Sequence, residues 1–294
     1  MAGAPVGGGA RWWQQVQVGK VKRLTIFAKG NLDIRDSLHS LWIGGELRWN
    51  GINELLREQG GELSVRIRHE TFSRSDALLA ADGAIPAQLE ERDLQLGAHT
   101  LATQFSDKLF AANADAYVLS VQPDLQIRLA VHRSGAFSFY PDHLREWAPG
   151  QRDWLRSEFA QDDYLDVDAS MANFSTIIGR IRAGSDAPIL FYNVSSVVPG
   201  ETVHCHEGMD ETLSTRIRRF NLALVELSRE TGVSIVDVDR IVAEAGAQSL
   251  AVDATHLTPA GCRAVAGEVL RILRDYGLIE EPDQFGAGMG GAGG

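Results

Sequence analysis

The sequence has few cysteines, no long apolar run and fewer basic than acidic residues. Its two cysteines, Cys205 and Cys262, lie far apart without paired spacing, which favours reduced thiols in a cytoplasmic protein over a disulfide framework. No apolar run reaches the roughly 18 residues of a membrane-spanning helix, and residues 1–10 lack the basic and apolar regions of a signal peptide. The net charge of −11 argues against a nucleic-acid or anionic-membrane surface. We therefore expect a soluble cytoplasmic protein that binds neither nucleic acid nor membrane.

Short apolar segments alternate with helical patterns along most of the chain. Strands are predicted at residues 22–28, 63–67, 116–121, 188–194 and 234–238. Helical spacing is found at residues 38–56 (interrupted by Gly44-Gly45), 106–114, within 142–182, at 210–231 and after Thr258. This alternation predicts an α/β fold, a three-layer, doubly wound sheet of about five mainly parallel strands flanked by helices on both sides.

The predicted domain organisation has three parts. Residues 1–20 are expected to form a loose arm, residues 21–279 one α/β domain, and residues 280–294 a flexible glycine-rich tail. Residues 126–140 alternate around Arg133-Ser134-Gly135, which indicates a hairpin. We interpret residues from about 126 to 165 as an insertion at the rim of the sheet.

A possible catalytic pair lies near the C-terminus, in the segment Asp253-Ala254-Thr255-His256. A spacing of three residues lets the carboxylate hold one imidazole nitrogen and leaves the other free, as acyl-transfer chemistry requires. Thr258 and Pro259 suit the N-cap and first position of a helix, so His256 should lie on a loop immediately before that helix. In isolation, such a pair is more often a capping Asp and a hydrogen-bonded surface His.

Three segments together resemble the SGNH/GDSL hydrolase superfamily, most closely its GSCFA-like and Gly-Ser-Cys-x-x-Arg-Asp branches. Residues 30–36, Gly-Asn-Leu-Asp-Ile-Arg-Asp, are similar to the first family block, and residues 253–256 to the last. Residues 191–199 are similar to the strand that ends in Ser-Pro-Val-Pro in GSCFA proteins. The resemblance implies that His256 is the general base, that Asp253 orients it, and that the substrate is a small or acylated molecule. It implies no cofactor.

The expected nucleophile is where the chain departs from this family. The family serine corresponds to Asn31, whose amide cannot form an acyl-enzyme. The alternative hydroxyl is Ser37, because Asp36-Ser37-Leu38 resembles part of the Gly-Asp-Ser-Leu motif, although Ser37 would lie a turn into the next helix. Gly30, Gln122, Arg35, Asn193 and His204 are the remaining residues predicted to contact substrate or its oxyanion, with Gln122 at the position of a family Asn.

Two other clusters leave alternatives open. The segment His204-Cys205-His206-Glu207 could contact substrate, form a plain surface loop or, least favourably, hold a metal, and we predict no metal site. Arg35 with Asp33 and Asp36 could be an ion pair that holds the turn or a site for a substrate anion. We expect an SGNH-like ester hydrolase or acyltransferase. The alternatives are a ligand-binding or partner module that has lost hydrolysis, and base chemistry without a covalent step. The sequence leaves the oligomeric state open.

Overall fold

A computed structural model describes residues 23–60, 63–197, 211–253 and 255–280. A central parallel sheet has the strand order β10-β9-β5-β1-β4. Its strands are β1 (Arg23–Lys29), β4 (Ser64–Glu70), β5 (Ala116–Ser120), β9 (Ile189–Tyr192) and β10 (Ser234–Val236). The predicted α/β fold with five parallel strands is confirmed.

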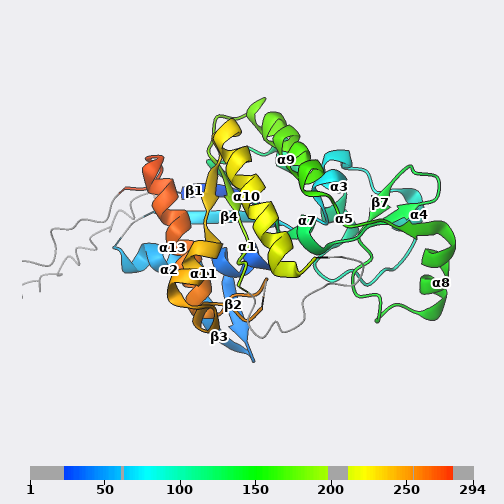
Figure 1. The fold of residues 1–294 in the computed structure, drawn as a ribbon, viewed down its shortest axis with the longest axis horizontal. Helices are drawn as coiled ribbons and strands as arrows, with labels where there is room; N and C mark the ends of the chain where they lie inside the picture. Colours follow the sequence, from blue (N-terminus) through cyan, green and yellow to red (C-terminus); the bar gives the residue numbers. More distant parts are fainter. Residues whose placement is uncertain (1–22, 61–62, 198–210, 254, 281–294) are drawn as a thin grey trace, which may run out of the picture.

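Helices cover both faces of this sheet, as Figure 1 shows. One face packs against α1 (Leu32–Leu38), α2 (Ile52–Glu58), α11 (Val238–Ala245), α12 (Ala247–Leu250) and α13 (Pro259–Asp275). The other packs against α3 (Ser75–Ala80), α6 (Lys108–Ala111), α7 (Gln122–Gln126), α9 (Val167–Arg182) and α10 (Leu213–Thr231). Neighbouring strand residues point to opposite faces, so Ala116 and Val118 enter the first core while Tyr117 and Leu119 enter the second.

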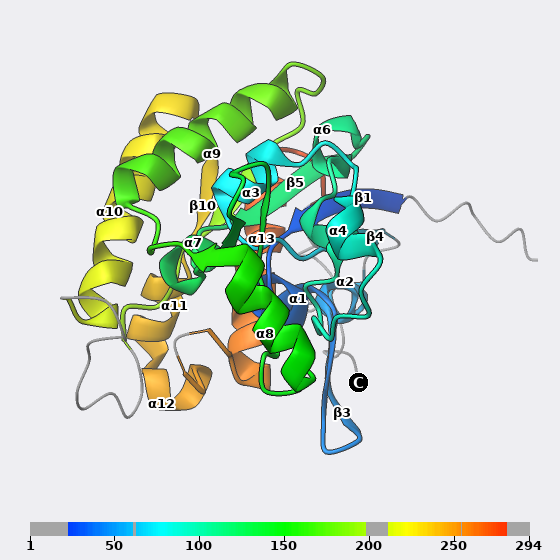
Figure 2. The ribbon, with the colours of Figure 1, turned by 90° about the vertical axis from the view of Figure 1, so that its right-hand side faces the viewer.

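Residues 38–56 differ from the prediction of a mainly helical segment. Strands β2 (Ser40–Ile43) and β3 (Glu46–Asn50) form an antiparallel hairpin that projects from the body (Figures 1 and 2). Gly44 and Gly45 have φ of 59° and 82°, values that glycine adopts without strain and that allow the tight turn. Trp42 is 62% exposed, so its helical spacing from other apolar residues does not reflect a buried face.

The helix predicted at residues 106–114 is also shorter than expected. Only α6 (Lys108–Ala111) is helical there. The Asp107 side chain makes no capping hydrogen bond, and the backbone becomes extended at Ala112 before β5 begins. The helix has no cap at its start and a nearby strand at its end, which together confine it to one turn.

A small lobe lies beyond the carboxyl ends of the central strands, at the right of Figure 1 and nearest the viewer in Figure 2. It consists of α4 (Ala87–Glu90), α5 (Leu101–Gln104), β6 (Ala130–His132), β7 (Ser138–Phe139), α8 (Pro149–Glu158) and β8 (Phe159–Gln161). The predicted hairpin is present as β6 and β7. Residues Ile85 to Phe105, which precede the predicted insertion, pack on the same aromatic core as Phe139 and Trp147. Within the described residues, no helix is long and apolar enough to cross a membrane.

Candidate functional site

The topology of the sheet brings the ends of β1 and β5 together at its carboxyl edge. The chain moves from β1 outward to β4 and then returns to β5 on the other side of β1, so the strand order reverses between β1 and β5. Ligands of doubly wound folds bind outside the strand ends at such a reversal. The first polar side chains after these two strands are those of Asn31 and Gln122.

Asn31 and Gln122 meet directly across this reversal. The Asn31 Nδ2 donates a hydrogen bond of 3.2 Å to Gln122 Oε1, and both residues are largely buried. Asn31 is the N-cap residue of α1, yet its side chain makes no capping bond. Asn31 Oδ1 is buried and has no hydrogen-bond partner among the described residues. The amide therefore faces Gln122 instead of capping its helix.

The carboxylate of Asp33 lies buried at the start of α1. Its Oδ2 accepts a hydrogen bond from Ser120 Oγ, at the end of β5, and its Oδ1 has no hydrogen-bond partner among the described residues. Burial raises the pKa of Asp33 above its ordinary value, and the hydrogen bond from Ser120 only partly opposes that rise. This contact was not predicted, because Ser120 belongs to a strand that is distant in the sequence.

Gly30 and His69 fix the turn that carries Asn31. Gly30 N–H donates to Glu70 O (3.1 Å), and Gly30 O lies 2.8 Å from His69 Nε2. A Cβ atom on Gly30 would overlap the fully buried side chain of Ile34, so a larger residue would displace α1. Burial lowers the pKa of His69 to about 4, so the ring is neutral at pH 7 and its Nε2–H donates to the Gly30 carbonyl.

The last helix brings His256 to the same edge of the sheet. Tyr276, which follows α13, lies with its hydroxyl 3.0 Å from Ser234 Oγ at the start of β10. Helix α13 therefore runs antiparallel to the strands, and its first turn lies at their carboxyl ends. Helices α1 and α13 pack against each other, and burial in that turn raises the pKa of the Cys262 thiol, with the carboxylate of Asp36 in α1 adding to the rise. The loop before α13 and the turn before α1 thus lie at one edge.

Asp253 and His256 form the predicted pair on that loop. The imidazole Nδ1 lies 2.7 Å from Asp253 Oδ2 and 2.9 Å from Oδ1. Asp253 Oδ1 also accepts 2.8 Å hydrogen bonds from the N–H groups of Thr255 and His256. Partial burial would raise the pKa of Asp253, but these hydrogen bonds outweigh it and hold the pKa below its ordinary value. The carboxylate therefore keeps the proton on Nδ1, and Nε2 has no protein partner within the described chain.

Ser37, the alternative nucleophile, lies inside the core and not at the edge of the sheet. It is fully buried, and its hydroxyl donates to Asp33 O (2.8 Å) and lies 3.1 Å from Tyr192 OH. Six residues after the N-cap, its side chain points into the core between α1 and β9 instead of toward the strand ends. The geometry therefore disfavours Ser37 as the residue that attacks a substrate.

The remaining predicted contacts are an exposed Arg35, a buried Asn193 that is bonded to neighbouring residues, and His204, which lies outside the described chain. Arg35 is exposed and pairs with Asp36 (2.8 Å), while Asp33 bonds Ser120, so the proposed three-residue cluster separates. Asn193 uses Nδ2 to reach Asp237 (2.7 Å) and Oδ1 to accept from the Asp239 N–H, which joins β9 to the start of α11. His204 and the neighbouring His206 and Glu207 lie outside the described residues. Within the described residues no group of three His, Cys, Asp or Glu could hold a metal ion.

Helix α7, which carries Gln122, is anchored by a buried aspartate. Asp124 is fully buried and accepts hydrogen bonds from Ser75 N (2.7 Å), Ser75 Oγ (2.5 Å) and Ser170 Oγ (2.6 Å). These bonds join α7 to α3 and α9. Burial raises the pKa of Asp124 to about 6 despite the three donors. The anchor fixes the helix whose first residue contacts Asn31.

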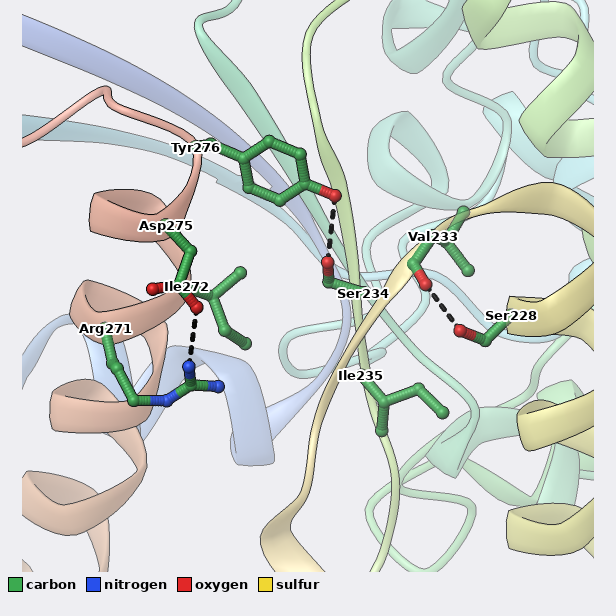
Figure 3. A pocket seen from close by; sticks show the side chains of 8 residues that line it. All are labelled: Ser228, Val233, Ser234, Ile235, Arg271, Ile272, Asp275 and Tyr276. Atoms are coloured by element: carbon green, nitrogen blue, oxygen red, sulfur yellow. Dashed lines mark hydrogen bonds and ion pairs between the residues drawn. The ribbon is translucent and has the colours of Figure 1, made fainter.

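A cavity of about 440 Å³ lies at the opposite edge of the sheet. Figure 3 shows that Ser234 faces Tyr276 there and that Arg271 faces Asp275. Ser228 Oγ donates to Val233 O at 2.6 Å. The polar groups of this cavity already satisfy one another, so it offers a ligand little to bind and is not the candidate site.

The comparisons with known proteins give a fold likeness only. No family model and no curated protein matches this chain. Among solved structures, the acetyl xylan esterase AlAXEase has a TM-score of 0.47 and 12% identity over 85% of this chain and 99% of that chain. A lipase/acylhydrolase from Enterococcus faecalis has a TM-score of 0.46 and 11% identity over 90% of this chain and 99% of that chain. A lipolytic G-D-S-L family member from Veillonella parvula has a TM-score of 0.42 and 12% identity over 86% of this chain and 98% of that chain. At these scores we transfer no residue role to this chain.

Proposed function

We propose that this protein is an SGNH-like hydrolase that cleaves an ester or related acyl bond without a covalent intermediate. The observation that carries the proposal is the Asp253–His256 pair, in which both carboxylate oxygens approach Nδ1 while Nε2 has no partner among the described residues. A neutral imidazole held in this tautomer is a general base for a proton within reach of Nε2. Among the described residues no serine hydroxyl hydrogen-bonds to His256, which makes water the nucleophile.

The reaction follows from these positions. Water attacks the acyl carbon while His256 Nε2 takes its proton, and Asp253 stabilises the imidazolium that forms. The negative charge that develops on the carbonyl oxygen is stabilised by side-chain amides at the carboxyl edge of the sheet. Gln122 Nε2 makes no hydrogen bond within the described chain and is the main donor for that oxygen. The imidazolium then returns its proton to the departing alkoxide, which leaves an acid and an alcohol.

Steady-state hydrolysis of p-nitrophenyl acetate and butyrate by the wild type and His256→Ala tests the proposal. We expect a loss of about 10²–10⁴-fold in kcat/KM for the variant with unchanged thermal unfolding. We also expect no labelling of the wild type by a fluorophosphonate, because labelling needs an activated hydroxyl. Equal turnover by both proteins excludes His256 as the base, and labelling of the wild type excludes the noncovalent route.

A ligand-binding protein without hydrolytic activity is the second candidate function. The observation that favours it is that the Asn31 amide, which the resemblance aligns with the family nucleophile, hydrogen-bonds Gln122 and has a buried Oδ1 without a partner among the described residues. The amide of Asn31 can both donate and accept, so it would hold a ligand well. Turnover of no ester in a broad panel, together with saturable ligand binding that Asn31→Ala removes, would favour this candidate.

A further inference from the structure

A second, smaller cavity lies where the lobe meets the main domain. Its volume is about 220 Å³, and its lining residues are Gln126, Arg128, Tyr140, Gln161 and Tyr164. Gln126 ends helix α7, which begins with Gln122. Four residues of helix rise about 6 Å, so the cavity begins about one helical turn from the amide that contacts Asn31.

The cavity offers hydrogen-bond donors and no acid. Its described lining includes no Asp or Glu, in a chain whose net charge is −11. Within the described residues, the hydroxyl of Tyr140 and the side-chain amides of Gln126 and Gln161 have no hydrogen-bond partner. Burial raises the pKa of Tyr140 to about 12, so its hydroxyl stays protonated and can donate at neutral pH.

Arg128 is the cation of this cavity and is held in place without a carboxylate. Its Nε donates to the backbone oxygen of Asp162 (2.9 Å), and its guanidinium lies 5.3 Å from the centre of the Tyr164 ring. Among the described residues no carboxylate lies within ion-pairing distance of Arg128, and its two Nη atoms make no hydrogen bond. The nearby acids are engaged elsewhere, since the Asp162 side chain binds Arg74 and Asp142 lies 3.0 Å from His99 Nδ1.

We propose that this cavity binds an anionic oxygen group, a carboxylate or a phosphate, on the part of the substrate that the reaction leaves unchanged. A guanidinium with two free nitrogens can bind such a group through paired hydrogen bonds. Tyr140 and the two glutamines provide further donors around it. That the anion belongs to a substrate rests on the proposed function, whereas the binding of the anion does not.

Isothermal titration calorimetry on the full chain tests the anion site directly, with inorganic phosphate, succinate and the uncharged analogue succinamide. We expect phosphate or succinate to bind and succinamide not to bind. Binding of succinate identifies the anionic group as a carboxylate, and binding of phosphate identifies it as a phosphate. Arg128→Gln should weaken binding at least tenfold, and Tyr140→Phe, which removes one hydroxyl, several-fold. Arg133→Gln is the matched control, because the Nε of Arg133 also donates to a backbone oxygen in the lobe, that of Ser157 (2.6 Å), outside the cavity. It should leave affinity within twofold.

The site is overturned if neither anion binds, if succinamide binds as well as succinate, or if Arg133→Gln weakens binding as much as Arg128→Gln. Unfolding curves of the two arginine variants show whether the fold is kept, and Tyr140→Phe supplies the test if Arg128→Gln is misfolded. His256→Ala should bind the anion as the wild type does. Anion binding in a protein that hydrolyses no ester would refute the proposed function and leave this site intact.

Discussion

Replacing Asp253 with Asn should keep His256 in place but shift its imidazole to the wrong tautomer. Asn can keep its oxygen where Asp253 Oδ1 accepts the N–H groups of Thr255 and His256, both at 2.8 Å, so the loop should persist. An NH₂ group then lies where Oδ2 is 2.7 Å from Nδ1, and it donates to that nitrogen. The imidazole proton moves to Nε2, the nitrogen that must accept a proton from water. The variant should therefore fold normally and lack the base.

The size of the effect follows from exposure. General-base catalysis contributes about 10²–10⁴-fold, and the same change at a fully buried orienting Asp of a serine protease costs about 10⁴-fold. Here the side chains of His256 and Asp253 are 43% and 49% exposed, so water competes for Nδ1 and restores part of the correct tautomer. We expect kcat/KM to fall by about 10²–10³-fold. The free energy of unfolding should change by less than about 1 kcal/mol, as for other exposed pairs.

Steady-state hydrolysis of p-nitrophenyl acetate measures this loss, with urea unfolding as the stability assay. Thr255→Val is the matched control, because the Thr255 hydroxyl lies 3.1 Å from Asp253 Oδ1 and 3.2 Å from His256 Nδ1 but carries no charge. Its kcat/KM should stay within a few-fold of wild type. The reasoning is refuted if Asp253→Asn retains at least half of the wild-type kcat/KM while His256→Ala is inactive, since Asp253 would then not orient the base.

Other residues at this edge of the sheet and its supports give four further predictions. Asn31→Ser should create a hydroxyl that a fluorophosphonate labels, whereas the wild type stays unlabelled, as seen by intact mass, and labelling that survives added His256→Ala would show that the two segments do not cooperate. Ser37→Ala should leave ester turnover unchanged and lower the free energy of unfolding by about 1–3 kcal/mol, because buried partners lose a hydrogen bond; a large loss of turnover with normal unfolding would return Ser37 to the site. Gln122→Ala should lower kcat by about 10²-fold with little change in KM, and a change confined to KM would assign it to ground-state binding. Because burial raises the pKa of Asp124 from 3.8 to about 6, its protonated form stabilises the fold below pH 3.8 and this stability is lost as pH rises through 6. Relative to Asp124→Asn, the wild type should therefore lose about 2 kcal/mol of unfolding free energy between pH 4 and pH 7, and a constant difference would contradict the buried-acid interpretation.

The main sheet was predictable because its strands are short, nearly continuous apolar segments. Parallel strands covered by helices on both faces give this pattern. The start of α13 was predictable from Thr258 and Pro259, and the Thr258 hydroxyl does accept from Gly261 N–H (3.2 Å). The β2–β3 hairpin was not predicted, because Leu41, Trp42 and Leu47 happen to have helical spacing. The glycine pair between them, Gly44-Gly45, which adopts positive φ, was the stronger local indication of a turn.

For the site, the order of strands and polar residues in the sequence predicted which residues lie at the carboxyl edge of the sheet. It did not predict which way their side chains point. Asn31 and Gln122 each follow a strand, and the carboxyl ends of neighbouring parallel strands meet at one edge. Ser37 lies in the same motif but six residues into the turn and helix, where the direction of the side chain depends on helical phase. The Asp33–Ser120 bond joins residues 87 positions apart, and no local pattern marks such a pair.

Asp33 and Asn31 are best understood together, because each leaves a buried side-chain oxygen without a described partner at the start of α1. The Asn31 amide hydrogen-bonds Gln122 instead of capping the helix, and its Oδ1 has no partner among the described residues. Asp33 Oδ2 accepts from Ser120 Oγ, whereas its Oδ1 also has no described partner. In the proposed mechanism, direct attack by water still places negative charge on the carbonyl oxygen and still expels the alkoxide, so this edge of the sheet must supply donors. Gln122 Nε2 makes no hydrogen bond within the described chain and can donate to that oxygen. The Gln122→Ala variant therefore tests the proposed mechanism more directly than any change at Asp33.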